Sequence, residues 1–321
     1  MRVAVLCGGR SSEHDVSLRS GAAVARGLRE AGHEAVEVTI GRDGAWRAPG
    51  GPVELAPGGG LLDAEAVFPA LHGAFGEDGS IQGLHEQLDV PYVGSDVLAS
   101  AICMDKLTLK RLFAAHGLPQ VDFAAVEGSD WWGRCEAMGL PLWVKPSRMG
   151  SSVGITRVSD LAKLDAAVEL ALRHDPRVIV EASSPGREVE CSVIGNEEPE
   201  ASLPGEIVAH GAWYDFEAKY TEGGMELRVP APIGEQATAN VRAMAVSAFK
   251  LAGCSGLARC DFFVEGDGSV LVNEINTMPG FTDTSVYAKL WEATGTGYPD
   301  LCDRLVQLAV ERHQLSRSYE F

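Results

Sequence analysis

The segment RCDFFVEGDGSVLVNEINTMPG, residues 259–280, contains two alternating apolar runs on either side of Asp267 and Gly268. An Asp-Gly pair between such runs is typical of a two-residue type I′ turn. The segment therefore predicts a β-hairpin. A three-residue turn would shift the strand register and change which side chains face each other.

Polar side chains are expected to share one face of this hairpin. With a two-residue turn, Asp261 faces Glu274 and Arg259 faces Asn276. Facing Cβ atoms lie about 4.5 to 5.5 Å apart and side chains alternate along a strand, so all four project to one side. Facing carboxylates repel unless a cation lies between them, and Asp, Glu and Asn oxygens suit Mg²⁺, which leaves positions open for phosphate oxygens. A solvated hairpin with edge charges is the alternative, but three ligand types and an arginine in one register favour a metal site.

Composition limits the class of protein. A chain of 321 residues with 45% hydrophobic residues and 37 glycines fits a globular α/β enzyme of two or three domains. The net charge of −18 argues against a nucleic-acid partner. Seven cysteines without a CxxC pair favour a reducing cytosol. The first residues are too weakly apolar for a signal peptide, and no run is long enough for a membrane span, so a cytoplasmic protein with no membrane partner is expected.

The N-terminal third predicts a parallel α/β sheet. A strand at 3–7 runs into the loop GGRSSEHDVS, and a helix and a strand at 36–40 follow. Such loops often carry function, which makes Glu13 a candidate although solvated loop charges are common. A further strand at 66–71 leads to His72 at the same rim of the sheet. Residues 41–62 are expected to be a surface connection.

Lys145 and the loop that follows it point to a phosphate site. Lys145 ends an apolar strand and precedes the loop PSRMGSSVG, whose backbone N–H groups can wrap an anion. Lys106 follows a predicted helix cap, Asp105, although a solvated cation is the ordinary interpretation there. Glu181 ends a buried run, where a lone carboxylate is costly, so hydrogen bonds to a base or sugar would explain it.

Two later segments are predicted to lack regular structure. The segment WYDFEAKYTEGG, residues 213–224, has no clean period and is predicted to be a long functional loop. Residues 281–291 are expected to be a loop that leads to a final helix from Pro299.

Seven motifs in order resemble the D-alanine:D-alanine ligase family of the ATP-grasp superfamily, from Val3 to about Glu311. They are CGGRSSEHDVSLRSG at 7–21, ALHGAFGEDGSIQG at 70–83, ASAICMDKLTLK at 99–110, KPSRMGSSVGI at 145–155, YDFEAKY at 214–220, ARCDFF at 258–263 and NEINTMPGFTDTS at 273–285.

The resemblance implies an α/β, three-domain ATP-grasp fold. Its expected parts are an N-terminal parallel-sheet domain at 1–117, a central subdomain with the Gly/Ser loop at 118–205, and a C-terminal subdomain with the metal and catalytic residues at 206–321. The implied reaction joins two D-alanine molecules through a D-alanyl phosphate, at the expense of ATP, to give the dipeptide used in peptidoglycan. The family is usually dimeric, which implies a homodimer formed through the first domain.

The resemblance also assigns roles by motif position. The residues that contact ATP would be Lys106, Lys145, Ser151, Glu181, Glu188 and Lys219, with Glu181 and Glu188 at the adenine and ribose. Two Mg²⁺ ions, which Mn²⁺ could replace, would be held by Asp261, Glu274 and Asn276. The substrates would be bound by Glu13, His72, Gly280 and Ser285. The catalytic residues would be Glu13, Ser151, Lys219, Tyr220 and Arg259, with Arg259 stabilising charge on the reacting carbonyl group.

Some positions depart from the family pattern or discriminate within it. Ala182 stands where many members have a lysine near the adenine, and Met149 replaces a commoner polar residue. A phenylalanine in place of Tyr220 accompanies synthesis of a D-Ala-D-lactate ester, so tyrosine favours the dipeptide.

Two alternatives are weaker. Another ATP-grasp ligase would share the nucleotide and metal residues and would differ around Glu13, Tyr220 and Ser285, but these positions match. A nucleotide-binding regulator without chemistry should lack Arg259 or a metal ligand, and none is missing.

Overall fold

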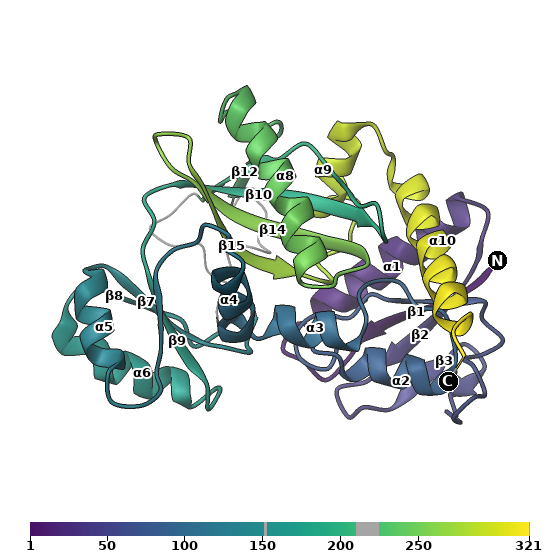
Figure 1. The fold of residues 1–321 in the computed structure, drawn as a ribbon. Helices are drawn as coiled ribbons and strands as arrows, with labels where there is room; N and C mark the ends of the chain where they lie inside the picture. The colour runs from purple at the N-terminus through teal and green to yellow at the C-terminus, as the bar shows by residue number, and fades with distance from the viewer. Residues whose placement is uncertain (151–152, 210–224, 321) are drawn as a thin grey trace.

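The structure is a computed structural model that describes residues 1–150, 153–209 and 225–320. Within these ranges the strands form three sheets (Figure 1). In the same part of the chain, no helix has both the length and the apolar character needed to cross a membrane.

The first sheet has the strand order β4-β3-β2-β1-β5. Its strands are β1 (Arg2–Gly8), β2 (Glu34–Ile40), β3 (Trp46–Ala48), β4 (Gly51–Pro52) and β5 (Ala66–Pro69). The helices of this region are α1 (His14–Glu30), α2 (Ser80–Leu88), α3 (Val97–Met104) and α4 (Lys106–Ala115). The pairs of β1 with β2 and β5 are parallel, which confirms the predicted parallel core. The expected connection at 41–62 is wrong in part, because β3 and β4 add an antiparallel edge.

The second sheet, with the order β6-β9-β7-β8, is antiparallel. Its strands are β6 (Phe123–Ala125), β7 (Leu142–Pro146), β8 (Thr156–Val158) and β9 (Val178–Ala182), accompanied by α5 (Trp131–Met138), the 3₁₀ turn η1 (Leu161–Lys163) and α6 (Leu164–Leu172). Leu142, Val144 and Val180 are fully buried in a core of their own. The sheet and its two α-helices form a separate lobe at the left of Figure 1.

The third sheet has the order β13-β12-β10-β14-β15, with β11 paired to β10. Its strands are β10 (Arg187–Gly195), β11 (Glu200–Ala201), β12 (Gly205–Ala209), β13 (Met225–Arg228), β14 (Gly256–Val264) and β15 (Val270–Asn276); the helices are α8 (Glu235–Leu251), α9 (Val286–Thr294) and α10 (Tyr298–Arg317). Because β10 pairs with β14 along its whole length, this topology favours a boundary between β9 and β10 over one at residue 205. The domain limits remain a prediction.

The loop expected at 281–291 is wrong, because most of it belongs to α9. Tyr287, Leu290 and Trp291 are buried on one face of this helix, at the spacing expected for an amphipathic helix. Phe281 packs against Phe68 of the first sheet, with ring centroids 5.2 Å apart. The first and third sheets thus share a core, and α10 lies beside α1 (Figure 1).

The turn of the β14–β15 hairpin has three residues, where the sequence predicted two. Glu265 N–H donates to the Ser269 carbonyl at 2.9 Å, and Gly268 N–H donates to the Glu265 carbonyl at 3.0 Å. Gly268 has φ +85°, the left-handed conformation that such loops need at their last position. The longer turn shifts the register near the tip, where Phe262 pairs with Val272.

A β-bulge restores the predicted pairs. The register changes between Asp261 and Phe262, because Asn273 is an extra residue in β15. Below the bulge Asp261 pairs with Glu274 and Arg259 pairs with Asn276, as predicted. The facing pairs therefore survive a turn that alone would have separated them.

Candidate active site

A cleft of about 400 Å³ lies where the three sheets meet. Among its lining residues are most of the predicted site residues: Glu13, His72, Lys106, Lys145, Glu181, Glu188, Arg259, Asp261, Glu274, Asn276 and Gly280. Ser285 lies beside Gly280, which lines the cleft, because a Cβ placed on Gly280 would be 3.5 Å from the Ser285 hydroxyl oxygen. Ser151, Lys219 and Tyr220 lie outside the described residues.

Arg259 organises the hairpin wall of the cleft. Its Nε and Nη2 atoms each donate to an Asp261 oxygen at 2.7 Å, and Nε lies 2.9 Å from Glu190 Oε2. Burial opposes the charge, but the Asp261 and Glu190 carboxylates outweigh it and hold the pKa of Arg259 well above its usual value. Glu190 was not predicted. It lies two residues after Glu188 in β10, so the two side chains are on the same face of the strand.

Two carboxylates and an amide from this hairpin fit Mg²⁺. Asp261 faces Glu274, and Asn276 Nδ2 donates to Asp261 Oδ2 at 3.1 Å. No cluster of three or more His, Cys, Asp or Glu side chains able to hold a metal occurs in the described ranges. A small set of hard oxygen donors is nevertheless what Mg²⁺ uses when phosphate oxygens and water complete its shell.

Glu181 lies between two lysines. Lys145 Nζ is 2.5 Å from Glu181 Oε2, and Lys110 Nζ is 3.2 Å from Oε1. Burial would raise the pKa of Glu181, but the two ammonium groups lower it to about 2. These ion pairs explain the buried carboxylate without a nucleotide base, so the adenine contact of Glu181 stays a prediction.

Lys110 was not predicted as part of the site. It is almost wholly buried, and burial lowers its pKa although Glu181 opposes the shift. Lys106 and Lys110 are four residues apart on α4, which places them on one helix face and could have indicated a pair.

Lys106 connects the β14–β15 hairpin to the segment PSRMGSSVG that follows Lys145, here called the phosphate loop. Its ammonium group donates to the Met149 carbonyl at 3.0 Å and lies 3.5 Å from Glu274 Oε2. One cation thus contacts both the loop that follows β7 and a predicted metal ligand on β15.

The side of the cleft next to the first sheet is lined by His72 and two glutamates, Glu13 and Glu77. His72 Nδ1 donates to the Met278 carbonyl at 3.0 Å, and Nε2 is 2.8 Å from the Ser20 hydroxyl, so both ring nitrogens already have protein partners. Burial lowers the pKa of His72, which keeps the ring neutral. Glu77 lies 3.9 Å from the ring, and burial followed by the Glu13 charge raises the pKa of Glu77 to about 8.

Gly73 fits this side of the cleft because it has no side chain. A Cβ at Gly73 would lie 2.4 Å from Glu13 Oε2, and φ is +71°. The sequence did not identify Glu77, whose only signal was its place in the motif that begins with His72.

Two family models together match most of the chain. The D-ala D-ala ligase C-terminus model matches residues 112–307, and the D-ala D-ala ligase N-terminus model matches residues 2–57 and 51–95. The chain belongs to the D-alanine:D-alanine ligase family.

Known members resemble this family member over nearly its full length. A D-alanine–D-alanine ligase of Solibacter usitatus is 43% identical over 324 residues, which cover 100% of this chain and 99% of the relative. The solved D-alanine-D-alanine ligase of Coxiella burnetii has a TM-score of 0.89 at 36% identity and covers 99% of this chain and 96% of that one. The VanG D-Ala:D-Ser ligase of Enterococcus faecalis has a TM-score of 0.86 at 33% identity, with 96% and 99% coverage. These similarities confirm the predicted ATP-grasp fold.

Replacing Lys110 by methionine should destabilise this ligase-family protein. The variant removes one of the two cations that compensate the buried Glu181 carboxylate, and because Lys145 remains, the cost should be at most the roughly 3 to 5 kcal/mol of a buried pair that loses a partner. Adding Glu181→Gln should not recover the loss, because the amide leaves the Lys145 ammonium group without its carboxylate partner. Urea unfolding of the single and double variants measures both effects.

Arg111 on the same helix provides the matched control. It pairs with Glu127 at 2.7 Å on the surface, so Arg111→Met should cost less than about 1 kcal/mol. Equal losses for Lys110→Met and Arg111→Met would contradict the buried triad.

Proposed function

We propose that the protein joins two D-alanine molecules in an ATP-dependent reaction and supplies D-alanyl-D-alanine for peptidoglycan synthesis. The observation that carries the proposal is the cleft in which the hairpin groups Arg259, Asp261 and Glu274 meet Lys106 and Lys145. Membership of the ligase family along nearly the whole chain supports it.

The first half of the reaction is a phosphoryl transfer. The carboxylate of one D-alanine attacks the γ-phosphorus of ATP, and the bond from that phosphorus to the β,γ-bridging oxygen breaks. ADP is the leaving group, and D-alanyl phosphate is the product. Such a transfer depends mainly on positioning and on cations around the transferred group. Lys106 and Lys145 supply fixed positive charge on the side of the phosphate loop.

The hairpin supplies the metal side of the same step. Asp261, Glu274 and Asn276 would hold the two Mg²⁺ ions. Bound Mg²⁺, or Mn²⁺ in its place, neutralises charge on the phosphate oxygens. Glu190 and Lys106 already hold Arg259 and Glu274 in place.

The second half forms the peptide bond. The neutral amine of a second D-alanine attacks the acyl carbon, and a negatively charged oxygen develops. Phosphate leaves as the carbonyl re-forms, and the nitrogen releases one proton. Arg259 is always charged and lines the cleft, so we assign it to that developing oxygen.

The remaining predicted residues orient the amino acids. Glu13 would bind the first ammonium group, whereas the Gly280 backbone and Ser285 would bind the second carboxylate. His72 acts through the Met278 carbonyl that it holds rather than through a free ring nitrogen. The roles of Ser151, Lys219 and Tyr220 remain predictions from the motifs.

We also propose a cytoplasmic homodimer. All seven cysteines are buried free thiols, which fits a reducing compartment. In the first domain Val97 and Leu98 expose apolar side chains on α3, with 67% of Leu98 exposed, which supports contact through this region.

Phosphate release from ATP and Mg²⁺ should depend on D-alanine, and mass spectrometry should identify D-alanyl-D-alanine as the product. L-alanine is the stereochemical control. Parallel reactions with D-alanine plus D-lactate and D-alanine plus D-serine test the second substrate, because a similar structure is named a D-Ala:D-Ser ligase. No release with any of these pairs would contradict the proposal.

Arg259→Ala should bind ATP yet lose peptide synthesis by about 100- to 1000-fold, since an oxyanion donor contributes roughly 3 to 4 kcal/mol to the barrier. Titration with ATP and steady-state turnover measure the two effects separately. Arg29→Ala, which breaks a surface pair with Glu37, is the control. Wild-type turnover in Arg259→Ala would remove Arg259 from the mechanism.

A further inference from the structure

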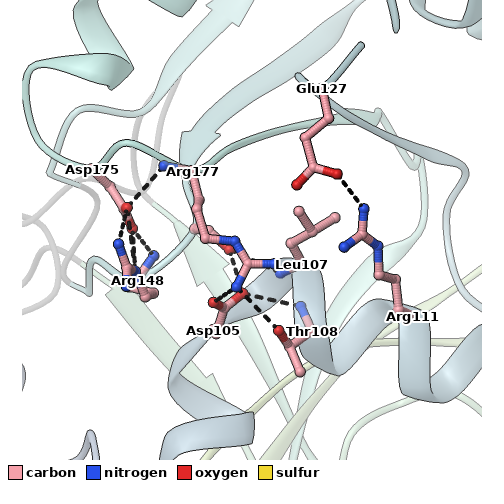
Figure 2. A network of polar contacts seen from close by, with 9 residues as sticks. Asp105, Leu107, Thr108, Arg111, Glu127, Arg148, Asp175 and Arg177 are labelled. Carbon is pink, nitrogen blue, oxygen red and sulfur yellow. Dashed lines mark hydrogen bonds and ion pairs between the residues drawn. The ribbon is translucent and has the colours of Figure 1, made fainter.

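A polar network outside the predicted site joins α4 to the start of the phosphate loop (Figure 2). Asp105, the residue before Lys106, accepts hydrogen bonds from Thr108 N–H at 3.0 Å and from the Ser147 hydroxyl at 2.7 Å. Its second oxygen pairs with the Arg177 guanidinium. Asp105 thus caps α4 and also contacts Ser147 and Arg177, which lie next to β7 and β9 in the lobe of the second sheet.

Backbone hydrogen bonds reinforce this connection. Lys106 N–H donates to the Ser147 carbonyl at 2.9 Å, and Leu107 N–H donates to the Ser147 hydroxyl at 3.0 Å. Ser147 N–H in turn donates to the Arg177 carbonyl at 2.9 Å. Ser147 is fully buried and lies two residues after Lys145. Both phosphate lysines are therefore tied to one point.

Asp175 fixes Arg148, the third residue of the segment PSRMGSSVG. Arg148 donates to Asp175 from its backbone N–H at 2.7 Å and from Nη2 at 2.7 Å, and Nε donates at 3.1 Å. Asp175 also accepts the Arg177 N–H at 2.9 Å and is buried, whereas the Arg148 side chain is half-exposed. Figure 2 shows the Arg148 side chain at Asp175 and the Arg177 guanidinium at Asp105.

The network is connected to a cleft cation, Lys106, through Met149. Met149 follows Arg148, and its carbonyl accepts the Lys106 ammonium group at 3.0 Å. If Arg148 were released from Asp175, this carbonyl would lose its fixed place. The Lys106 charge would then lose a partner that holds it in the cleft.

We propose that Asp105, Ser147, Arg148, Asp175 and Arg177, together the loop anchor, fix the separation of Lys106 and Lys145 that the ATP phosphates require. Arg148 and Asp175 are thus positioning residues for the nucleotide. This inference rests on the proposed use of ATP. A purely structural network would change stability and leave nucleotide affinity alone, because no member of the Arg148–Asp175 pair lines the cleft.

The test compares Arg148→Gln, Asp175→Asn and the double variant with Glu127→Gln. The control breaks the surface pair between Glu127 and Arg111, which also ties α4 to the second lobe but lies away from the loop (Figure 2). Calorimetric titration in the absence of D-alanine gives the Kd for the Mg²⁺ complex of ATP. Steady-state kinetics give the KM for ATP and the KM for D-alanine. Urea unfolding records stability.

The loop anchor predicts a Kd and a KM for ATP about tenfold higher in each single variant, equivalent to about 1.4 kcal/mol. The double variant should be no worse than the singles, because they remove the same pair. The KM for D-alanine should match that of Glu127→Gln, and Arg148→Lys should recover part of the affinity.

Two results would overturn the loop anchor. The first is a Kd for ATP in Arg148→Gln equal to that in Glu127→Gln. The second is an equal rise in the KM values for ATP and for D-alanine, in proportion to the loss of stability. If Arg148→Gln does not fold, because it leaves the buried Asp175 carboxylate without its guanidinium, Asp175→Asn decides in its place, since it leaves behind only the half-exposed Arg148 side chain. A wild-type protein that does not bind ATP would instead overturn the proposed function.

Discussion

Two carboxylates that face each other in a partly buried cleft need positive charge between or beside them, and the active site is arranged around this requirement. Asp261 and Glu274 pair across the β14–β15 hairpin. Arg259 compensates the first and Lys106 the second. Because side chains alternate along a strand, a register error of one residue would turn these groups to the opposite face. The bulge at Asn273 is thus a functional feature of the hairpin, since it corrects the shift that the three-residue turn introduces.

The same requirement is met at two further places. Glu181 is compensated by Lys110 and Lys145, and Asp105 by Arg177. Buried pairs of this kind add little net stability, because desolvation offsets most of the attraction, but removing one partner is costly. Their effect is to fix where the cations lie before any ligand arrives. Fixed cations suit phosphoryl transfer, in which the protein contributes position and charge more than covalent chemistry. The phosphate side of the cleft is therefore organised by ion pairs that reach beyond the cleft wall.

Local patterns in the sequence predicted the parts of the fold that short-range chemistry determines. The hairpin, its polar face and the parallel strands of the first sheet follow from alternation and turn residues. The three-residue turn was missed because an Asp-Gly pair gives no sign of a compensating bulge farther along the strand. Helix α9 was missed because its apolar spacing begins directly after a polar turn. Lys110 and Glu77 interact with segments far apart in the chain. Their only local signals were the spacing of Lys110 from Lys106 on α4 and the place of Glu77 in the motif that begins with His72. The burial of Glu181 was predicted, whereas its explanation by two lysines required the structure.

We propose that this cleft transfers a phosphoryl group to a carboxylate before the peptide bond forms. The most direct test uses D-alanine with both carboxylate oxygens replaced by ¹⁸O, together with unlabelled ATP and Mg²⁺. Attack by the carboxylate carries one of its oxygens to the γ-phosphorus, so the inorganic phosphate released with the dipeptide should contain one ¹⁸O atom, measured by the isotope shift of its ³¹P resonance. Unlabelled phosphate would show that water attacks ATP instead and would contradict the mechanism assigned to the cleft.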